Sequence, residues 1–271
     1  MLNSKIKKIK SMRRSGYSFH EIVRKAHVSS RDALKYSTNI KFSRIGKIRH
    51  KNLNGIVKDI KRQNKKLSGI KIRIIGNLLF DGSVYMTKEK QHVIMYVNSS
   101  YELVKEFCED VLQIYGVKPN VYDADGKYVN LYRAKCGSKL IYLDLLKYMK
   151  SYSTSSPFSK IPEEIMNGSK FIKKIFLQTF WNNEGSVSSI NGALSGTSKS
   201  RKVIEQLFKL HVALGINLYI CKDKRGFYIL KLNKNNENYQ KFYRFKLFTE
   251  SRVAHGYAMG SRKIDVLRKF L

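Results

Sequence analysis

Acidic residues, proline and cysteine are scarce in this chain of 271 residues, and each of these shortages excludes some class of protein or structure. Three prolines argue against long disordered tracts. The three cysteines (Cys108, Cys136 and Cys221) are too far apart for a disulfide framework or a zinc ligand set, so each is expected to be a small buried residue. No apolar run approaches the roughly 18 residues that span a bilayer, and residues 1–14 lack the apolar stretch of a secretory signal. We therefore expect an intracellular protein (cytoplasm or nucleoid) without structural metal.

Positively charged side chains are abundant in the sequence. The 53 lysines and arginines outnumber the 20 acidic residues, giving a formal net charge of +33. Such an excess repels itself unless a polyanion offsets it, so nucleic acid is the expected partner and an acidic membrane surface the weaker alternative. About half of this charge lies in residues 1–68, which hold 20 lysines and arginines against three acids. This asymmetry indicates a basic arm attached to a larger body.

Residues 1–40 predict three short helices. The first covers Ile6–Arg14 and ends near Gly16, the second follows Ser18 as its N-cap, and the third covers Arg31–Tyr36 after Ser29 or Ser30. This pattern resembles the helix-turn-helix of resolvase-like DNA-binding arms. The major groove would then be contacted by Ser29, Ser30, Arg31 and Lys35. The alternative is a small helical cap with a solvated basic face, followed by a basic connector (41–68) that is partly helical near Ile56–Ile60.

From residue 69 onward the chain repeats one pattern of elements twice. Helical segments Ile70–Phe80 and Phe171–Asn183 each follow a serine N-cap and each lead into an acidic residue and a glycine. A β-hairpin, a long amphipathic helix, two further strands and a last helix come after each of them, in the order α-β-β-α-β-β-α. An internal repeat this regular predicts an α+β fold made of two equivalent halves, residues 69–150 and 169–250, joined by a linker at 151–168. Residues 251–271 end in a basic helix with no assigned role.

Two nine-residue motifs carry a family resemblance. Residues 74–82 (IIGNLLFDG) and 177–185 (LQTFWNNEG) resemble the motif that names the LAGLIDADG homing endonucleases. The IPEEI sequence at 161–165 resembles the lead-in to the second motif of single-chain members. The resemblance covers roughly residues 69–250. It implies a pseudo-twofold saddle of two four-stranded antiparallel sheets, and a monomer, because both half-sites lie in one polypeptide.

The last acid of each motif, Asp81 and Glu184, is the predicted metal ligand. Two helices packed side by side bring the acids beyond their C-terminal ends together, and like charges held that close need a cation between them. Mg²⁺ (or Mn²⁺) prefers carboxylate oxygens, water and phosphate, and two or more ions are expected. The alternative, a helix-end acid before a glycine turn, is weaker, because acids oppose the helix dipole at that end.

Three departures from the motif matter. At the helix contact, the first copy has a small residue, Gly76, and the second has the bulkier Thr179. Glu184 replaces the aspartate of the family name, which moves the carboxylate by one methylene. The position of the earlier aspartate holds Leu79 and Asn182, and is expected to serve packing or capping. By contrast, Asp123 opens an Asp-Ala-Asp-Gly sequence that is expected to be only a hairpin turn.

The sheets are expected to read double-stranded DNA, because alternate residues of each strand share one face. The resemblance also implies basic side chains beside the metal, for which strand position favours Lys135 and Lys231 in a catalytic role. For each single candidate, a solvated surface residue is an equal alternative. The candidate DNA contacts are Tyr85, Thr87, Lys88, Arg133, Lys135, Ser186, Ser188, Lys222, Lys224, Lys231 and Asn233.

The resemblance implies hydrolysis of both strands of a long, imperfectly palindromic DNA site, with staggered 3′ overhangs. Two alternatives stay open from the sequence: a DNA-binding regulator of the same fold without catalysis, and an RNA-binding intron maturase. Dependence of strand scission on Mg²⁺ would separate them, whereas salt-sensitive affinity would not.

Overall fold

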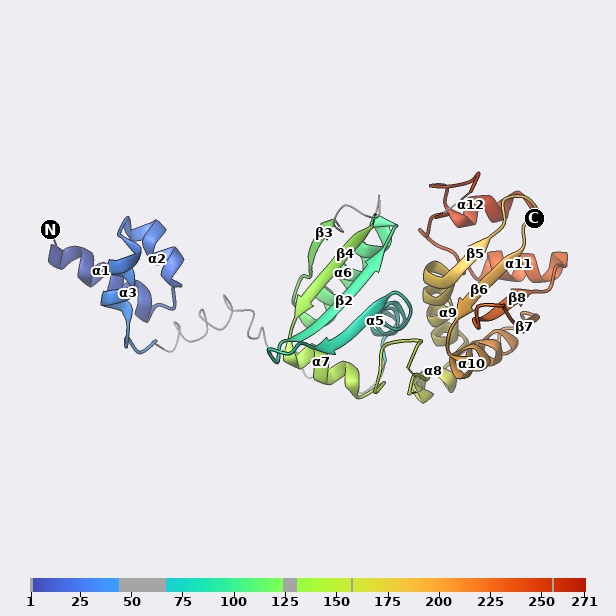
Figure 1. The fold of residues 1–271 in the computed structure, drawn as a ribbon, viewed down its shortest axis with the longest axis horizontal. Helices are drawn as coiled ribbons and strands as arrows, with labels where there is room; N and C mark the ends of the chain where they lie inside the picture. Colours follow the sequence, from blue (N-terminus) through green and yellow to red (C-terminus); the bar gives the residue numbers. More distant parts are fainter. Residues whose placement is uncertain (1, 44–66, 124–130, 157, 255) are drawn as a thin grey trace. The chain divides into compact units, whose positions relative to one another are not determined.

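The structure, a computed structural model, describes residues 2–43, 67–123, 131–156, 158–254 and 256–271 (Figure 1). Its contacts divide the chain into two units, Met1–Ile60 and Lys61–Leu271, which are described separately. Most of the predicted connector, including the helix expected near Ile56–Ile60, lies outside the described residues.

Three helices form the first unit: α1 (Leu2–Arg14), α2 (Phe19–Ala26) and α3 (Ser30–Ser37). They pack pairwise around a small apolar core that includes Ile9 and Ile22. Ser18 caps α2 through a capping box, in which its hydroxyl accepts from the Glu21 N–H and the Glu21 carboxylate accepts from the Ser18 N–H. Ser29, not Ser30, caps α3, because its hydroxyl accepts from the Asp32 N–H at 3.0 Å.

The second unit contains the predicted order of elements twice, which confirms the α+β fold class. The first repeat consists of α5 (Gly69–Phe80), β1 (Gly82–Met86), β2 (His92–Asn98), α6 (Tyr101–Tyr115), β3 (Asn120–Asp123), β4 (Tyr132–Gly137) and α7 (Lys139–Leu146). The second consists of α9 (Lys170–Glu184), β5 (Gly185–Val187), β6 (Leu194–Ser198), α10 (Arg201–Val212), β7 (Leu218–Lys222), β8 (Tyr228–Leu232) and α11 (Asn236–Arg244). A short α8 (Glu163–Met166) lies between the repeats, and α12 (Lys263–Arg268) follows them.

Each repeat builds one four-stranded antiparallel sheet. The strand orders are β1-β2-β4-β3 and β5-β6-β8-β7, so the two sheets are topologically equivalent. In the first sheet, alternate residues such as Ile94, Tyr96 and Ala134 are buried on the face that α6 and α7 cover. Their neighbours in register, such as Met95 opposite Lys135, lie on the other face, which we call the open face.

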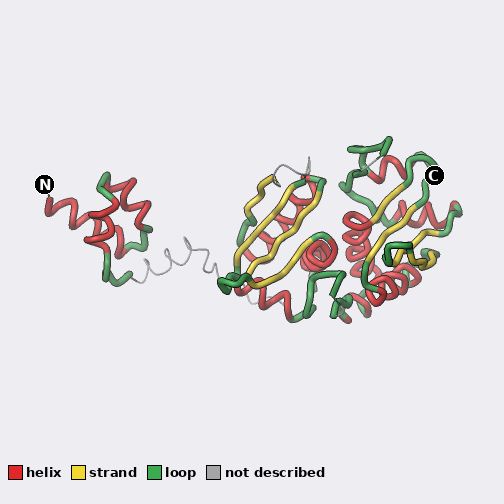
Figure 2. Tube along the Cα trace, in the orientation of Figure 1, coloured by secondary structure: helices red, strands yellow, loops and turns green. Residues whose placement is uncertain are grey.

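Helices α5 and α9 pack against each other between the two sheets (Figure 2). Gly76 of α5 lies against Thr179 of α9, and a Cβ atom added at Gly76 would overlap the threonine hydroxyl. Aromatic rings continue the contact, since the ring of Phe80 lies 5.7 Å from Phe176 and 5.3 Å from Phe180. The lack of a side chain at Gly76 therefore allows the two motif helices to approach closely.

Several boundaries differ from those expected. β4 begins at Tyr132, and β3 ends at Asp123, so the predicted Asp-Ala-Asp-Gly turn falls mainly outside the described residues. The expected basic C-terminal helix is shortened to α12. It is docked through Val266 and Leu267, which are buried, and so it forms part of the second unit. In the described residues, no helix is long and apolar enough to cross a membrane.

Candidate functional site

Asp81 and Glu184 stand at the C-terminal ends of the two central helices. Asp81 is the C-cap of α5: its N–H donates to the Asn77 carbonyl at 3.1 Å, and its own carbonyl accepts from the Val97 N–H at 3.0 Å. Glu184 is the last residue of α9, immediately before Gly185. A Cβ at Gly82 would lie 2.6 Å from the Leu78 Cα, and one at Gly185 would overlap the Trp181 carbonyl. The glycine of each motif thus lets the chain turn tightly from helix to strand just behind the acid.

A network of carboxamides connects the two motifs. The Asn98 Nδ2 atom donates to the Asp81 carboxylate at 3.0 Å and to the Asn183 Oδ1 atom at 3.1 Å. Tyr96 donates its hydroxyl to the same Asn183 oxygen at 2.7 Å, and Asn183 donates to the Asn77 Oδ1 atom at 2.9 Å. The residue before Glu184 therefore bonds to the first repeat, and this network fixes the Asp81 carboxylate relative to α9.

Burial makes ionisation of both acids costly. Desolvation raises the pKa of Asp81 to about 6, although the charge of Lys263 and the hydrogen bond from Asn98 act in the opposite direction. Desolvation and the charge of Asp81 raise the pKa of Glu184 to about 8, while Lys263 and a hydrogen bond from Thr197 lower it. The two carboxyl groups thus repel each other across the repeat interface, which is the electrostatic setting of a cation site.

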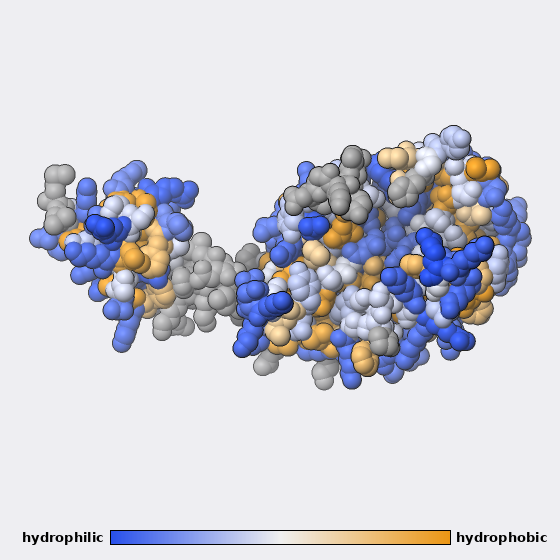
Figure 3. Space-filling model, viewed as in Figure 1, coloured by the Kyte–Doolittle hydropathy of each residue, from blue (hydrophilic) through white to orange (hydrophobic). Residues whose placement is uncertain are grey.

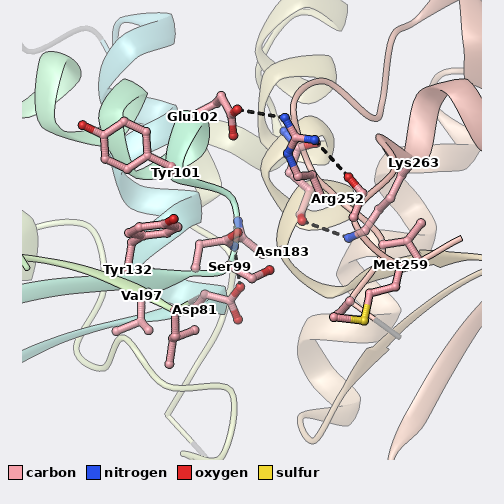
Figure 4. Close-up of a pocket in the computed structure, with 16 residues that line it drawn as sticks. Asp81, Val97, Ser99, Tyr101, Glu102, Tyr132, Asn183, Arg252, Met259 and Lys263 are labelled. Carbon is pink, nitrogen blue, oxygen red and sulfur yellow. Dashed lines mark hydrogen bonds and ion pairs between the residues drawn. The ribbon is translucent and has the colours of Figure 1, made fainter. Parts of the chain in front are cut away.

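Lys263 supplies the positive charge that acts on both carboxyls. It is 8% exposed, at the start of α12, and its Nζ atom donates to the Asn182 carbonyl at 3.2 Å. Desolvation lowers the pKa of Lys263 to about 8 despite the two acids, which raise it. Asp81 and Lys263 line one cavity of about 610 Å³, on whose opposite walls they stand in Figure 4.

These shifts predict a specific pH dependence of stability for the metal-free protein. A carboxyl whose pKa is raised on folding stabilises the folded state fully below its unfolded pKa, and that contribution is lost as pH rises through the folded value. For Asp81 and Glu184 the loss occurs between about pH 4 and pH 8. Glu184→Gln is therefore expected to raise the melting temperature relative to the wild type increasingly from pH 5 to pH 8, in calorimetry with a chelator present.

The exposed acid Glu163 provides the control. Glu163→Gln should leave the pH dependence of the melting temperature as in the wild type. Above pH 8 the contribution of Lys263 to stability has the opposite sign. Because the pKa of Lys263 is lowered in the folded state, stability increases between about pH 8 and the pKa of this lysine in the unfolded chain. A difference in melting temperature between Glu184→Gln and the wild type that stays constant from pH 5 to pH 8 would contradict the electrostatic description of the site.

The donor atoms present fit a hard divalent cation. Asp81 and Glu184 offer carboxylate oxygens, the ligands that Mg²⁺ and Mn²⁺ take together with water and phosphate. Within the described ranges, no group of three or more histidine, cysteine or acidic side chains could hold a metal ion by itself. A cation at the two acids would therefore complete its coordination with water and substrate oxygens, as an open site requires.

The open face of the first sheet carries several of the predicted DNA contacts. Tyr85 is paired with Val93, Lys135 with Met95, and Arg133 with Val97, so these residues share the face that α6 and α7 do not cover. Arg133 lies next to the acid end of the sheet, because its partner Val97 bonds to the Asp81 carbonyl. Its Nε atom is buried without a hydrogen-bond partner in the structure, and its guanidinium carbon is 5.9 Å from the centre of the Tyr122 ring.

The open face of the second sheet follows the same register, with one correction. Ser186 and Lys231 both pair with Ser195 and share the open face, so Lys231 is the counterpart of Lys135 in the first sheet. Lys222 was expected there but lies on the opposite face, because it pairs with Tyr228, two residues before the buried Leu230. Strand β7 presents Tyr219 and Cys221 to the open face instead.

The remaining candidates lie in turns beside the strands. Thr87 and Ser188 use their hydroxyls locally, as acceptors for the Gln91 N–H and for the Ile190 and Asn191 N–H groups. The other three, which are exposed, are Lys88, Lys224 and Asn233. Figure 3 shows hydrophilic residues over much of the face drawn for this unit.

Comparison with known proteins agrees with this geometry. A family model described as a LAGLIDADG-like domain matches residues 172–245, from α9 to the end of α11. The second repeat is a LAGLIDADG-like domain. The motif resemblance is thus confirmed for this repeat by a family match, and solved structures share the fold of both repeats. No curated protein matches the chain.

Three solved structures share the fold of both repeats. I-DmoI in complex with DNA and Mn is 17% identical, with 67% of this chain and 97% of that chain covered and a TM-score of 0.51. The homing endonuclease I-WcaI bound to its DNA recognition sequence is 19% identical, with coverage of 70% and 86% and a TM-score of 0.51. An I-DmoI variant in complex with its target DNA in the presence of Mg is 18% identical, with coverage of 69% and 99% and a TM-score of 0.50.

The candidate site also contains residues that the sequence analysis missed. Lys263 was noticed only as part of a basic terminal helix, although it acts on both acids. Asn98 and Asn183 were given no role in the site, although both bond within the carboxylate network. Asn183 precedes a motif acid, which was the available signal. Asn182 bonds to the Thr249 hydroxyl at 2.7 Å, and so it serves packing at the position of the motif's earlier aspartate.

Proposed function

We propose that this protein is a sequence-specific double-stranded DNA endonuclease that hydrolyses phosphodiesters on both strands, with Mg²⁺ or Mn²⁺ held by Asp81 and Glu184. The observation that carries the proposal is the placement of the two acids at the ends of adjacent helices in equivalent repeats. Related structures in complex with DNA and Mn, or bound to a DNA recognition sequence, support it by fold.

In the proposed mechanism, the cation and the side chains of the protein have separate roles. When bound, the cation polarises the scissile phosphate and lowers the pKa of its water. Asp81 and Glu184 hold it as carboxylates, so both acids must lose their protons. Burial opposes this loss, because it favours the protonated carboxyl groups. Metal affinity should therefore increase with pH up to about 8. Asn98 keeps the Asp81 carboxylate in place through its 3.0 Å hydrogen bond.

Recognition is proposed to use the open faces of both sheets. Arg133, Lys135 and Lys231 offer donors to guanine edges and phosphates, and Tyr85 and Ser186 stand beside them. Lys135 and Lys231 hold equivalent places, two residues along their strands from the residues nearest the acids. We infer a long pseudo-palindromic target read by a monomer, cut with staggered 3′ overhangs. The target itself would be defined by the sum of many such contacts.

The first unit is proposed to bind DNA through α3. Arg31, Leu34 and Lys35 share one exposed side of that helix at helical spacing, with Ser30 at its first turn. Arg31→Ala with Lys35→Ala is expected to weaken binding to the selected duplex by about tenfold or more in fluorescence anisotropy, because both side chains would face the groove.

The matched control is Lys7→Ala with Lys10→Ala, which removes the same charge from exposed positions of α1. It should weaken binding by a smaller factor at the same salt concentration, since only the general attraction to phosphate is reduced. Equal losses for the two pairs would indicate that this unit is a basic cap without a reading helix.

The experiment that tests the central proposal is cleavage of a randomised double-stranded DNA library by the full chain with Mg²⁺. Recovery of a recurring long site at cut ends, dependent on Mg²⁺ and lost with a chelator, is the expected result. The library also tests a second candidate, a DNA-binding regulator, which the buried Lys263 favours because its charge partly offsets the charges of the two acids without a metal. Selection of a specific duplex without cleavage at any Mg²⁺ concentration would support the regulator.

A further inference from the structure

The C-terminal segment, residues 250–254 and 256–263, crosses from the second repeat to the first beside the cavity that Asp81 lines. The Ser100 hydroxyl donates to the Glu250 carbonyl at 2.9 Å, at the N-terminal end of α6. Two residues further along each segment, the Arg252 guanidinium donates to the Glu102 carboxylate at 2.9 Å, which lowers the pKa of Glu102 to about 2. The segment is therefore attached to the first repeat by a charged pair at the rim of the cavity (Figure 4).

The segment then turns back and delivers Lys263 to the site. The Val253 N–H donates to the Ser261 carbonyl, and the Gly260 N–H donates to the Val253 carbonyl, both at 2.9 Å. The Lys263 N–H donates to the Ser251 carbonyl at 2.9 Å, which closes the base of this loop. Beyond it, α12 is anchored by buried apolar residues, so the position of the Lys263 side chain is determined by the whole segment.

The charge of Lys263 duplicates part of what a metal ion would provide. Its Nζ atom donates to the Asn182 carbonyl, two residues before Glu184 at the end of α9, and Lys263 lines the same cavity as Asp81. From this position its charge acts on both carboxyl groups. With both acids ionised and Lys263 protonated, the three side chains sum to one negative charge instead of two. A divalent cation bound to the same carboxylates would be repelled by the ammonium, and burial makes that repulsion stronger than in water.

We propose that Lys263 is a tethered cation that competes with the divalent metal ion for Asp81 and Glu184, so that metal binding loosens the C-terminal segment from the first repeat. This rests on the proposed function insofar as these two acids are the metal ligands. The segment then acts as a built-in competitor: it balances the buried acids while the site is empty of metal, and it sets the metal concentration at which the site fills.

The test is a Mn²⁺ titration of the full chain without DNA, followed by electron paramagnetic resonance of the free ion. Lys263→Met keeps a long side chain of similar volume against Phe248, whose ring lies 5.6 Å from the ammonium, and removes the charge. It is expected to tighten Mn²⁺ binding by about tenfold or more, because one repulsive charge at a buried site is lost. Lys269→Met removes the same charge from an exposed position at the C-terminal end of α12 and should leave the affinity unchanged.

Three further measurements keep the result unambiguous. Lys263→Arg retains the charge and should keep the affinity of the wild type, and thermal melting establishes that all variants are folded. Amide hydrogen exchange in residues 251–262 should increase when Mn²⁺ is added to the wild type. The proposal is overturned if Lys263→Met binds Mn²⁺ as the wild type does or more weakly, or if Mn²⁺ protects the segment.

The outcome is separable from that of the endonuclease proposal. If Asp81→Asn abolishes Mn²⁺ binding and Lys263→Met tightens it, the competition stands even when no DNA is cut. If Mn²⁺ binding is insensitive to Asp81→Asn, the two acids are not the ligands and both proposals fail. If the protein cuts DNA while Lys263→Met leaves Mn²⁺ affinity unchanged, only the competition fails.

Discussion

Asp81→Asn and Glu184→Gln are each expected to lower Mg²⁺-dependent DNA cleavage by about a thousandfold. Each amide keeps the shape of its side chain but loses the negative charge that attracts the cation. A metal ion contributes several kcal/mol of charge stabilisation to the transition state, and about 1.4 kcal/mol corresponds to each tenfold in rate. The measurement is the single-turnover rate on the site recovered from the library. Folding should survive in both variants, because ionising either buried carboxyl opposes folding above its unfolded pKa.

The linker helix provides the matched control for this loss. Glu163→Gln makes the same chemical change at an exposed acid of α8 and should cut at the rate of the wild type. Binding of the target in Ca²⁺ or without metal should be kept by all three variants, since recognition is proposed to reside in the sheets. Cleavage within tenfold of the wild type by either acid variant would remove that residue from the metal site.

The repeat and the position of both acids could be predicted from the sequence because they depend on local signals. Ser68 and Ser169 begin α5 and α9 as N-caps, each accepting from a backbone N–H three residues on. The glycine after each motif acid marks the end of the helix, and the first β-hairpin of each repeat follows its acid at nearly the same spacing. Two copies of the same local pattern therefore placed Asp81 and Glu184 at equivalent helix ends without knowledge of any tertiary contact.

The face of a strand was harder to predict, as Lys222 demonstrates. Side chains alternate along β7, so a judgement that is wrong by one residue assigns a lysine to the opposite face. Tyr219 and Cys221, not Lys222, share the open face with Lys231. The burial of Leu230 and Leu232 on the partner strand determines this, and that burial depends on α10 packing over the sheet.

Lys263 could not have been assigned to the site from the sequence. It lies in a basic run near the C-terminus, 79 residues after Glu184, where a solvated lysine is the ordinary expectation. It is placed by tertiary contacts: α12 docks through Val266 and Leu267, and the chain before it bonds to Ser100 and Glu102. Asn98 is similar, because its bond to Asp81 arises only when β2 pairs beside the end of α5.

Substitution of Gly76 by leucine is expected to lower the free energy of unfolding by more than about 3 kcal/mol, because overpacking this contact forces α5 and α9 apart. Even a Cβ atom here would overlap the Thr179 hydroxyl and lie 2.8 Å from the Thr179 Cβ atom. Gly76→Ala should therefore also destabilise, although alanine favours a helix over glycine by about 1 kcal/mol. Chemical denaturation of the metal-free chain measures both changes.

A double-mutant cycle decides whether the helix contact is the cause. Thr179→Gly removes the atoms that Gly76→Ala would meet, so the two changes should be coupled favourably by at least about 1 kcal/mol. Gly137→Ala is the control, because a Cβ atom there has its nearest neighbour 3.8 Å away and should change stability little. Additive effects of the two substitutions would show that α5 and α9 do not meet at these residues. The carboxylates at the ends of these helices would then lack the close approach on which the metal site depends.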